Sequence, residues 1–158
     1  MRTVILENEL LQIGVLADKG SDIFRFLYKP CDVDFLYLRE GGVRNPARDV
    51  PSIPSSGGAF LDYYSGGWQE ILPNGGGPSS YRGAEYGQHG EVSLVPWDVA
   101  VVEDTPDRVA VRFRVSCRRT PLVVEKVLSL ARGEAVLTID ERVQNTSRER
   151  IAFMWGHH

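Results

Sequence analysis

The sequence predicts an all-β protein, built as an antiparallel β-sandwich or barrel, from three observations. Apolar and polar residues alternate along residues 109–118, as they do in a strand that buries one face. Turn signals separate the apolar runs at intervals of about 10 to 14 residues, a spacing typical of long strands in a meander. No segment carries a convincing helical pattern: residues 123–131 fit a helical period, but their β-branched valines favour a strand.

Three regions follow one another along the chain. In residues 3–38, short apolar runs alternate with charged and glycine-containing breaks, which predicts strands joined by tight turns. Residues 39–90 hold most of the glycines and prolines and show neither strand nor helix periodicity. A loop of this length is usually functional or disordered, and its embedded aromatic residues favour an ordered loop packed on a surface.

The clearest strands lie in the third region, residues 91–155. In "RVAVRFRVSCR" one face is shared by Val109, Val111, Phe113, Val115 and Cys117. In "AVLTIDERVQN" one face is shared by Ala135, Leu137, Ile139, Glu141 and Val143. We therefore expect residues 1–158 to form a single β-sandwich domain, with residues 39–90 as a long loop region that forms the site.

Composition and charge exclude several classes of protein. The 158 residues are 42% hydrophobic and 25% charged, with a formal net charge of -3. This balance is that of a globular domain and argues against a nucleic-acid binder. No run of about 18 apolar residues predicts a membrane span, and the N-terminus lacks the pattern of a signal peptide, so we expect a cytoplasmic protein. Cys31 and Cys117 stand far apart, which predicts two separate core thiols in a reducing compartment.

The segment "GGWQEILPNGGGPSSYRGAEYGQHGE", residues 66–91, combines the residue types that sugar sites use. An aromatic face such as that of Trp68 covers the apolar side of a pyranose, and amide, guanidinium and carboxylate groups bind its hydroxyls. The segment provides these groups in Asn74, Arg82 and Glu91, and it adds His89, a candidate acid or base. The alternative is a solvated loop whose glycines and asparagine serve turn geometry.

The final stretch, "FMWGHH", places His157 and His158 directly after an apolar strand. Adjacent residues of a strand point to opposite faces, so the pair is not expected to bind one metal ion, and the sequence shows no third ligand. The "NTS" motif at Asn145 is interpreted as a turn.

In their order along the chain, "GGWQEILPN", "HGE", the strand meander, "VQNTS" and "FMWGHH" resemble the aldose 1-epimerase (galactose mutarotase-like) superfamily. The resemblance runs along the whole chain but covers only about the first half of what the family contains. It implies a large antiparallel β-supersandwich that is incomplete here, and we therefore expect an N-terminal fragment.

The resemblance also implies an activity, the interconversion of the α and β anomers of a free aldose. A carboxylate takes the proton of the C1 hydroxyl, a histidine protonates the ring oxygen, and the opened ring recloses as the other anomer; no cofactor is needed. Carried onto this chain, His89 binds and polarises the substrate and His158 is the general acid. No residue here matches the family's carboxylate.

The same resemblance suggests substrate-binding residues, with open alternatives. They are Asn74, Arg82, Glu91, Trp68 and His157. Arg82 would replace an arginine that commonly follows the family's asparagine, where this chain has Gly75. Glu91 could instead simply begin the next strand.

Two other functions remain open at this stage. One is a carbohydrate-binding module without catalysis, and the other is a purely structural β-domain of a larger carbohydrate enzyme. The sequence identifies neither the sugar, nor whether it is phosphorylated, nor the oligomeric state.

Overall fold

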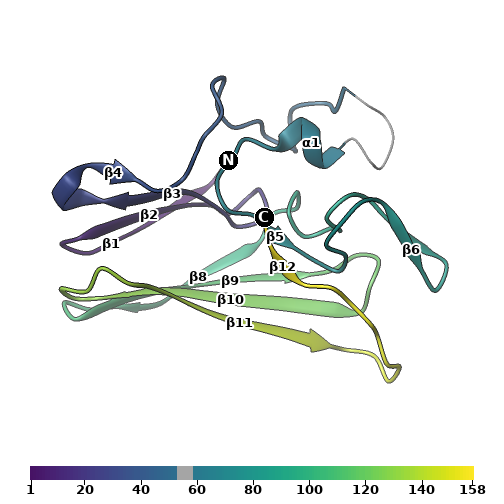
Figure 1. The fold of residues 1–158 in the computed structure, drawn as a ribbon. Coiled ribbons are helices and arrows are strands. Elements are labelled where there is room, and N and C mark those ends of the chain that lie inside the picture. Colours follow the sequence, from purple (N-terminus) through teal and green to yellow (C-terminus); the bar gives the residue numbers. More distant parts are fainter. Residues whose placement is uncertain (53–58) are drawn as a thin grey trace.

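Two antiparallel four-stranded sheets packed face to face form the body of the protein (Figure 1). A computed structural model describes residues 1–52 and 59–158. The first sheet is a meander in the order β1-β2-β3-β4, with bounds Thr3–Glu7, Leu11–Leu16, Asp22–Tyr28 and Val33–Asp34. The second is a meander in the order β11-β10-β9-β8, with bounds Leu137–Asn145, Leu122–Ala131, Arg108–Ser116 and Asp98–Asp104. The all-β prediction is confirmed, and residues 123–131 lie in a strand.

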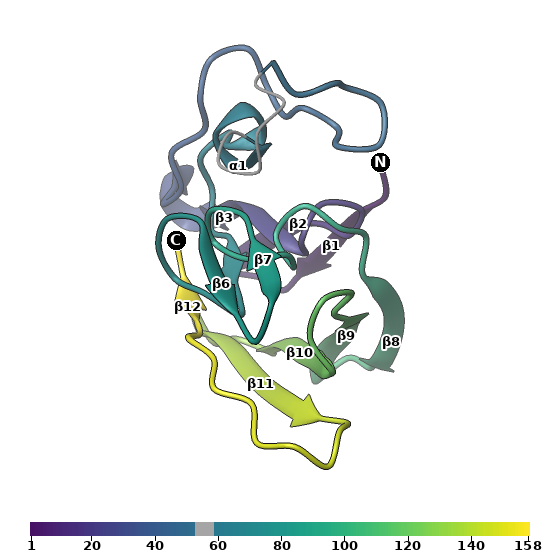
Figure 2. The ribbon, with the colours of Figure 1, turned by 90° about the vertical axis from the view of Figure 1, so that its right-hand side faces the viewer.

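Short elements fill the glycine-rich region and the C-terminal end. They are the 3-10 turn η1 (Lys29–Cys31), the helix α1 (Ala59–Tyr63), and the strands β5 (Glu70–Ile71), β6 (Ser79–Tyr81), β7 (Ala84–Tyr86) and β12 (Gly156–His157). The expectation of no helix is wrong at α1, which is too short for a periodic sequence pattern to reveal it. In Figure 2, α1 lies beyond the first sheet, on the side away from the second sheet.

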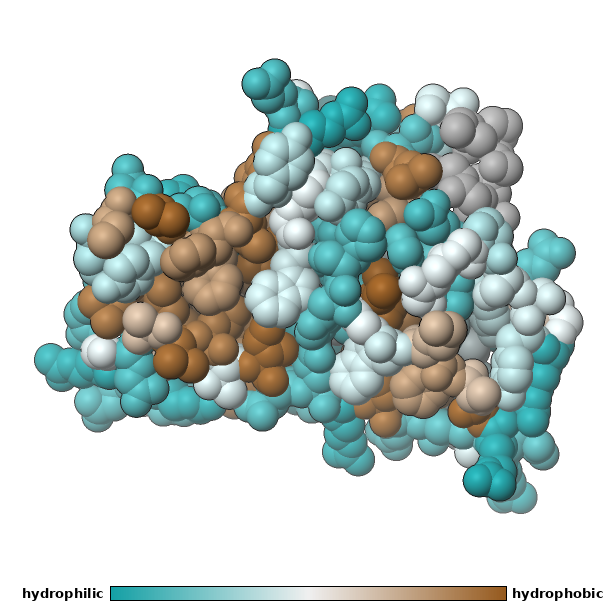
Figure 3. Space-filling view, viewed as in Figure 1, coloured by the Kyte–Doolittle hydropathy of each residue, from teal (hydrophilic) through white to brown (hydrophobic). Residues whose placement is uncertain are grey.

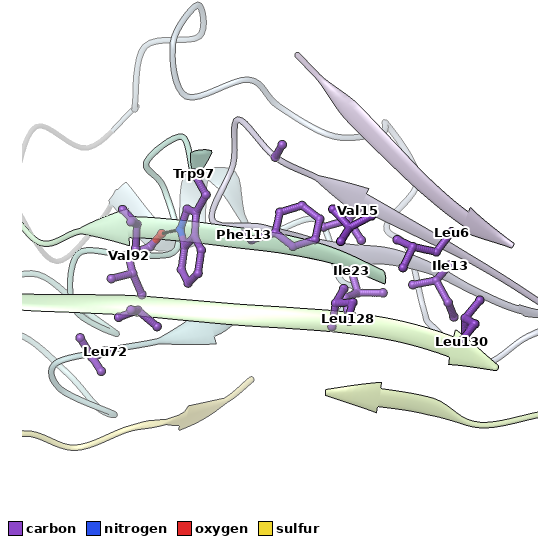
Figure 4. Packing of buried hydrophobic residues seen from close by; sticks show 14 of the residues in the cluster. Leu6, Ile13, Val15, Ile23, Leu72, Val92, Trp97, Phe113, Leu128 and Leu130 are labelled. Atoms are coloured by element: carbon purple, nitrogen blue, oxygen red, sulfur yellow. Dashed lines mark hydrogen bonds between the residues drawn. The ribbon is translucent and has the colours of Figure 1, made fainter. Parts of the chain in front are cut away.

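The core lies between the two sheets and takes side chains from both. Figure 4 shows Phe113 of β9 beside Val15 of β2, and Leu128 of β10 beside Ile23 of β3. At one end, Trp97 is fully buried and donates its indole Nε1–H to the carbonyl of Val92 at 3.0 Å. Burial of apolar area stabilises such a sandwich, and this hydrogen bond offsets the cost of burying the indole nitrogen.

Strand β9 shows how closely the alternation predicts the structure. Val111, Phe113 and Val115 are buried, and the arginines between them are exposed. Ala110 departs from the pattern because it is fully buried although it belongs to the predicted polar face. The pairing of β8 with β9 shifts register opposite this residue, which marks a local irregularity in the sheet.

Strand β11 is an edge strand whose inward face is only half-buried. Exposed apolar side chains also lie in the segment that precedes β12, at Phe153 and Met154. Two more lie just after η1, at Val33 and Phe35. In Figure 3 apolar surface gathers where β3 and β4 lie. Apolar groups at open sheet edges are available for contact with further β-structure.

Cys31 and Cys117 are both free thiols. The prediction of two core thiols is wrong for Cys31, which is exposed in η1, whereas Cys117 is half-buried at the end of β9. Among residues 1–52 and 59–158, no helix has the length and apolar character needed to cross a bilayer.

Candidate functional site

The C-terminal histidines are held by a short antiparallel pairing of β12 with β5. Gly156 pairs with Ile71 and His157 pairs with Glu70. Beyond the strand, His158 and Gln69 exchange two backbone hydrogen bonds, of 3.0 and 3.2 Å. Side chains alternate along a strand, so His157 and His158 leave β12 on opposite faces, as the sequence predicts.

On one face, His158 lies in a cluster of four rings. Its ring centroid is 4.9 Å from that of His89, 4.9 Å from Tyr64 and 5.4 Å from Phe60. The Phe60 ring also contacts His89 edge-on at 4.5 Å. Because Phe60 belongs to α1, the helix covers this pair of imidazoles with an aromatic wall.

The glycine-rich loop fixes His89 through its backbone. His89 has φ +60°, a left-handed conformation, and donates its N–H to the carbonyl of Gly76 at 2.9 Å. The next residue, Gly90, has φ +83°, and a Cβ there would lie 2.0 Å from the carbonyl oxygen of Leu72. Only glycine fits so close to a neighbouring backbone. The loop sequence therefore fixes the backbone of His89, and Nε2 of its ring lies 3.3 Å from Nε2 of Gln88.

Asn74 supports the same loop through its side chain. Its side chain is buried and donates hydrogen bonds to the carbonyls of Gly77 and Gly87, both at 3.1 Å. These bonds join the two stretches of loop that flank the hairpin β6–β7. The amide nitrogen is thereby occupied in positioning the loop that carries His89, while the buried Oδ1 accepts no hydrogen bond from the described residues.

The environment of His89 lowers the pKa of its ring and so favours the neutral imidazole at pH 7. Burial, together with the neighbouring ring of His158, lowers the pKa of His89 below the usual value, against a smaller opposing effect of the Gly75 backbone. A neutral imidazole can donate from one nitrogen and accept at the other. Two imidazoles 4.9 Å apart, walled by aromatic rings, can therefore move protons to and from a bound hydroxyl or ring oxygen.

On the opposite face of β12, His157 joins a charged network. Its Nε2 lies 3.2 Å from Oε1 of Glu141 on β11 and 3.3 Å from Oε2 of Glu70 on β5. The buried Glu70 also lies 3.4 Å from Nζ of Lys126 on β10 and accepts a hydrogen bond from the indole of Trp155. Side chains from β5, β10 and β11 thus form one charged network around His157.

The network fixes the charge of its members. Hydrogen bonds to Glu141 and then to Glu70 raise the pKa of His157 to about 9, so its ring is cationic at pH 7. Burial alone raises the pKa of Glu70, but the hydrogen bond from His157 and the charge of Lys126 outweigh burial and lower it to about 2. Burial, with the nearby Glu70, raises the pKa of Glu141.

The same three side chains are the group of possible metal ligands found in the described part of the chain. Ligand atoms of Glu70, Glu141 and His157 lie within 4.8 Å of one another. The sequence showed no such ligands beside His157, because the two carboxylates come from strands that are distant in sequence. A metal ion would have to displace the proton of His157 and compete with Lys126, and the ion pairs already account for the arrangement.

Three other predicted site residues do not join His89 and His158. Trp68 lies on the face of His157, with ring centroids 5.3 Å apart. Arg82 is half-exposed in the turn between β6 and β7, where it covers the ring of Tyr81. Glu91 neither begins a strand nor faces the histidines: its carboxylate accepts the backbone N–H groups of residues 118 and 119 and so closes that loop.

Sequence reasoning missed four residues that shape the two faces. Phe60 and Tyr64 were visible only as aromatic residues in a region without periodicity, and Glu70 only as part of "GGWQEILPN". Glu141 carried a clearer signal, because it is the one charged residue on the otherwise apolar face of the predicted strand 135–143.

Comparison with known proteins gives a likeness in structure alone. A scan against protein-family models and a search of curated proteins found no match. Among solved structures, a galactose mutarotase-like protein from Lactobacillus casei ATCC 334 matches with a TM-score of 0.65 at 12% identity, over 99% of this chain and 48% of that chain. A galactose mutarotase related enzyme from Lactobacillus acidophilus matches with a TM-score of 0.66 at 17% identity, over 99% and 48%.

A provisionally assigned aldose 1-epimerase from Escherichia coli K12 also matches, with a TM-score of 0.60 at 17% identity, over 99% of this chain and 50% of that chain. The chain spans about half the length of these solved structures. Its two meandering sheets therefore have the galactose mutarotase-like fold, over a length that corresponds to about half of those proteins.

Proposed function

We propose that this chain carries the histidine half of an aldose 1-epimerase-type site, which interconverts the α and β anomers of a free sugar. The observation that carries the proposal is the meeting of His89 and His158, with ring centroids 4.9 Å apart, on a fold shared with mutarotase-like proteins. The two residues come from distant parts of the sequence, and the loop geometry of one and the strand pairing of the other bring them together.

In the proposed reaction His89, neutral at pH 7, donates a hydrogen bond to a sugar oxygen and polarises the anomeric centre. His158 delivers a proton to the ring oxygen as the C1–O5 bond breaks, and a base takes the proton of the C1 hydroxyl. The C1–C2 bond then rotates, and reversal of the two proton transfers closes the other anomer. Only proton transfers are needed, so no cofactor takes part. Phe60 and Tyr64 offer apolar ring surface beside the two imidazoles.

A non-catalytic carbohydrate-binding module is the second candidate, and one observation favours it. The carboxylates Glu70 and Glu141 bond His157, on the face of β12 opposite to His158. They are therefore not placed to act as the base beside His89. If no other carboxylate completes the site, the chain binds an aldose without opening its ring.

The test is to follow the optical rotation of freshly dissolved α-glucose and α-galactose with the protein expressed from its native reading frame. We expect faster mutarotation, and losses of about 100-fold or more in His89→Asn and in His158→Asn, because general acid–base groups contribute about 10² to 10⁴ each. Tyr37→Phe, an exposed tyrosine whose side chain lies outside the cluster, is the control.

Two outcomes oppose the proposal. Wild-type rates in both histidine variants refute it. Sugar binding without any acceleration by the wild-type protein instead supports the carbohydrate-binding module. The predicted cytoplasmic location and the predicted single domain over residues 1–158 stay part of this proposal.

A further inference from the structure

The geometry points to a positioning role for the network of Glu70, Glu141 and His157: it fixes β12 so that His158 faces His89. The inference rests on the proposed function and concerns residues that do not touch the reacting atoms. It gives a role to the face of β12 that carries His157, which takes no part in the proposed proton transfers.

Backbone contacts alone hold β12 weakly. The strand has two residues, which pair with Ile71 and Glu70. Besides this ladder, the segment makes two backbone bonds between His158 and Gln69 and one from the N–H of Met154 to the carbonyl of Pro73, at 2.8 Å. So short a ladder leaves the strand free to rotate or shift unless its side chains are anchored. A displacement of about 1 Å at a reacting group can cost about 100-fold in rate.

The side chain of His157 supplies that anchor from two strands at once. Its Nε2 lies between the carboxylates of Glu141 on β11 and Glu70 on β5, at 3.2 and 3.3 Å. Glu70 is fully buried and is itself held by Lys126 and by the indole of Trp155. Trp155 lies two residues before His157, so Glu70 contacts the final segment at two residues, Trp155 and His157.

Side chains alternate between the two faces of a strand, so fixing the ring of His157 on one face of β12 also orients the ring of His158 on the other. The contacts of His157 with the network restrain the backbone at that residue, and alternation then directs His158 to the ring cluster of Phe60, Tyr64 and His89. Among the described residues, the charged groups that face His157 are Glu70 and Glu141 directly and Lys126 through Glu70, and they belong to this one network.

The experiment compares Glu141→Gln with Asp140→Asn, which makes the same chemical change one residue earlier, on the exposed face of β11. A pair of variants at the anchor itself completes the set: His157→Gln retains a donor to the carboxylates, and His157→Leu removes it. Three readouts are taken: the nuclear Overhauser contact between the rings of His89 and His158, kcat and KM separately, and the pH profile of kcat.

For Glu141→Gln and His157→Leu we expect the ring contact to weaken and kcat to fall about tenfold or more while KM changes less. In Glu141→Gln the alkaline limb of the profile moves to lower pH, because His157 loses one anionic partner and deprotonates earlier. His157→Gln restores part of kcat, and Asp140→Asn matches wild type in all three readouts.

Two patterns of result separate failure of this inference from failure of the proposed function. An intact ring contact with wild-type kcat and alkaline limb in Glu141→Gln and in His157→Leu overturns the positioning role and leaves the function standing. A wild-type protein without catalysis refutes the function, and the ring contact then decides the positioning role alone: loss in His157→Leu supports it, and persistence overturns it.

Discussion

The ion pair of Lys126 with Glu70 gives the sharpest prediction about stability. Both side chains are almost fully buried, with Nζ 3.4 Å from Oε2. Their Coulomb attraction at an effective dielectric constant of about 20 is about 5 kcal/mol, and breaking a buried pair by removing one partner costs about 3–5 kcal/mol. In Lys126→Met, Glu70 keeps its hydrogen bonds from His157 and Trp155, so we expect the lower end of this range, about 3 kcal/mol.

The assay is urea unfolding followed by tryptophan fluorescence. With a denaturant slope of about 2 kcal/mol per molar urea, a loss of about 3 kcal/mol lowers the midpoint by about 1.5 M. The matched control is Lys29→Met, which breaks the more exposed pair with Glu7 and is expected to cost less than about 1 kcal/mol. Equal midpoints for Lys126→Met and Lys29→Met would refute the assignment of a stabilising role to the buried pair.

Three further predictions follow from the site. The lowered pKa of Glu70 contributes stability that is present above pH 4.5 and lost as pH falls through about 2. The raised pKa of His157 contributes stability that is present below pH 6.5 and lost as pH rises through about 9. Unfolding midpoints measured against pH check both effects. Gly90→Ala should cost more than about 2 kcal/mol in thermal unfolding, because its Cβ meets the backbone of Leu72. The ring of His89 should titrate below pH 6.5 by NMR, and a titration above that value contradicts the account of its burial.

Local patterns predicted the strands well because each strand carries its own period. The alternation around Phe113 gave β9, and the period of two placed His157 and His158 on opposite faces. The patterns failed where contacts are distant in sequence. Nothing local to β11 shows that Glu141 meets His157, because their contact depends on how β12 pairs with β5.

The candidate site was predictable only in part for the same reason. The resemblance named His89 and His158, and the structure brings them together. Asn74 and Glu91 are polar residues in a suitable loop, yet both use their side chains to fix backbone. A loop with residues at positive φ uses polar side chains to hydrogen-bond its own backbone. Amino-acid composition does not distinguish such side chains from side chains that bind a ligand.

The chain has three histidines, so the response of each ring to sugar can be followed separately. Long-range ¹H–¹⁵N spectra of the imidazoles, recorded while α-galactose or α-glucose is added, resolve each ring separately. We expect the signals of His89 and His158 to shift together with a saturable dependence on sugar, while the signal of His157 does not shift. A shift of His157 alone, or three unmoved rings at saturating sugar, would contradict the assignment of the site to this face of β12.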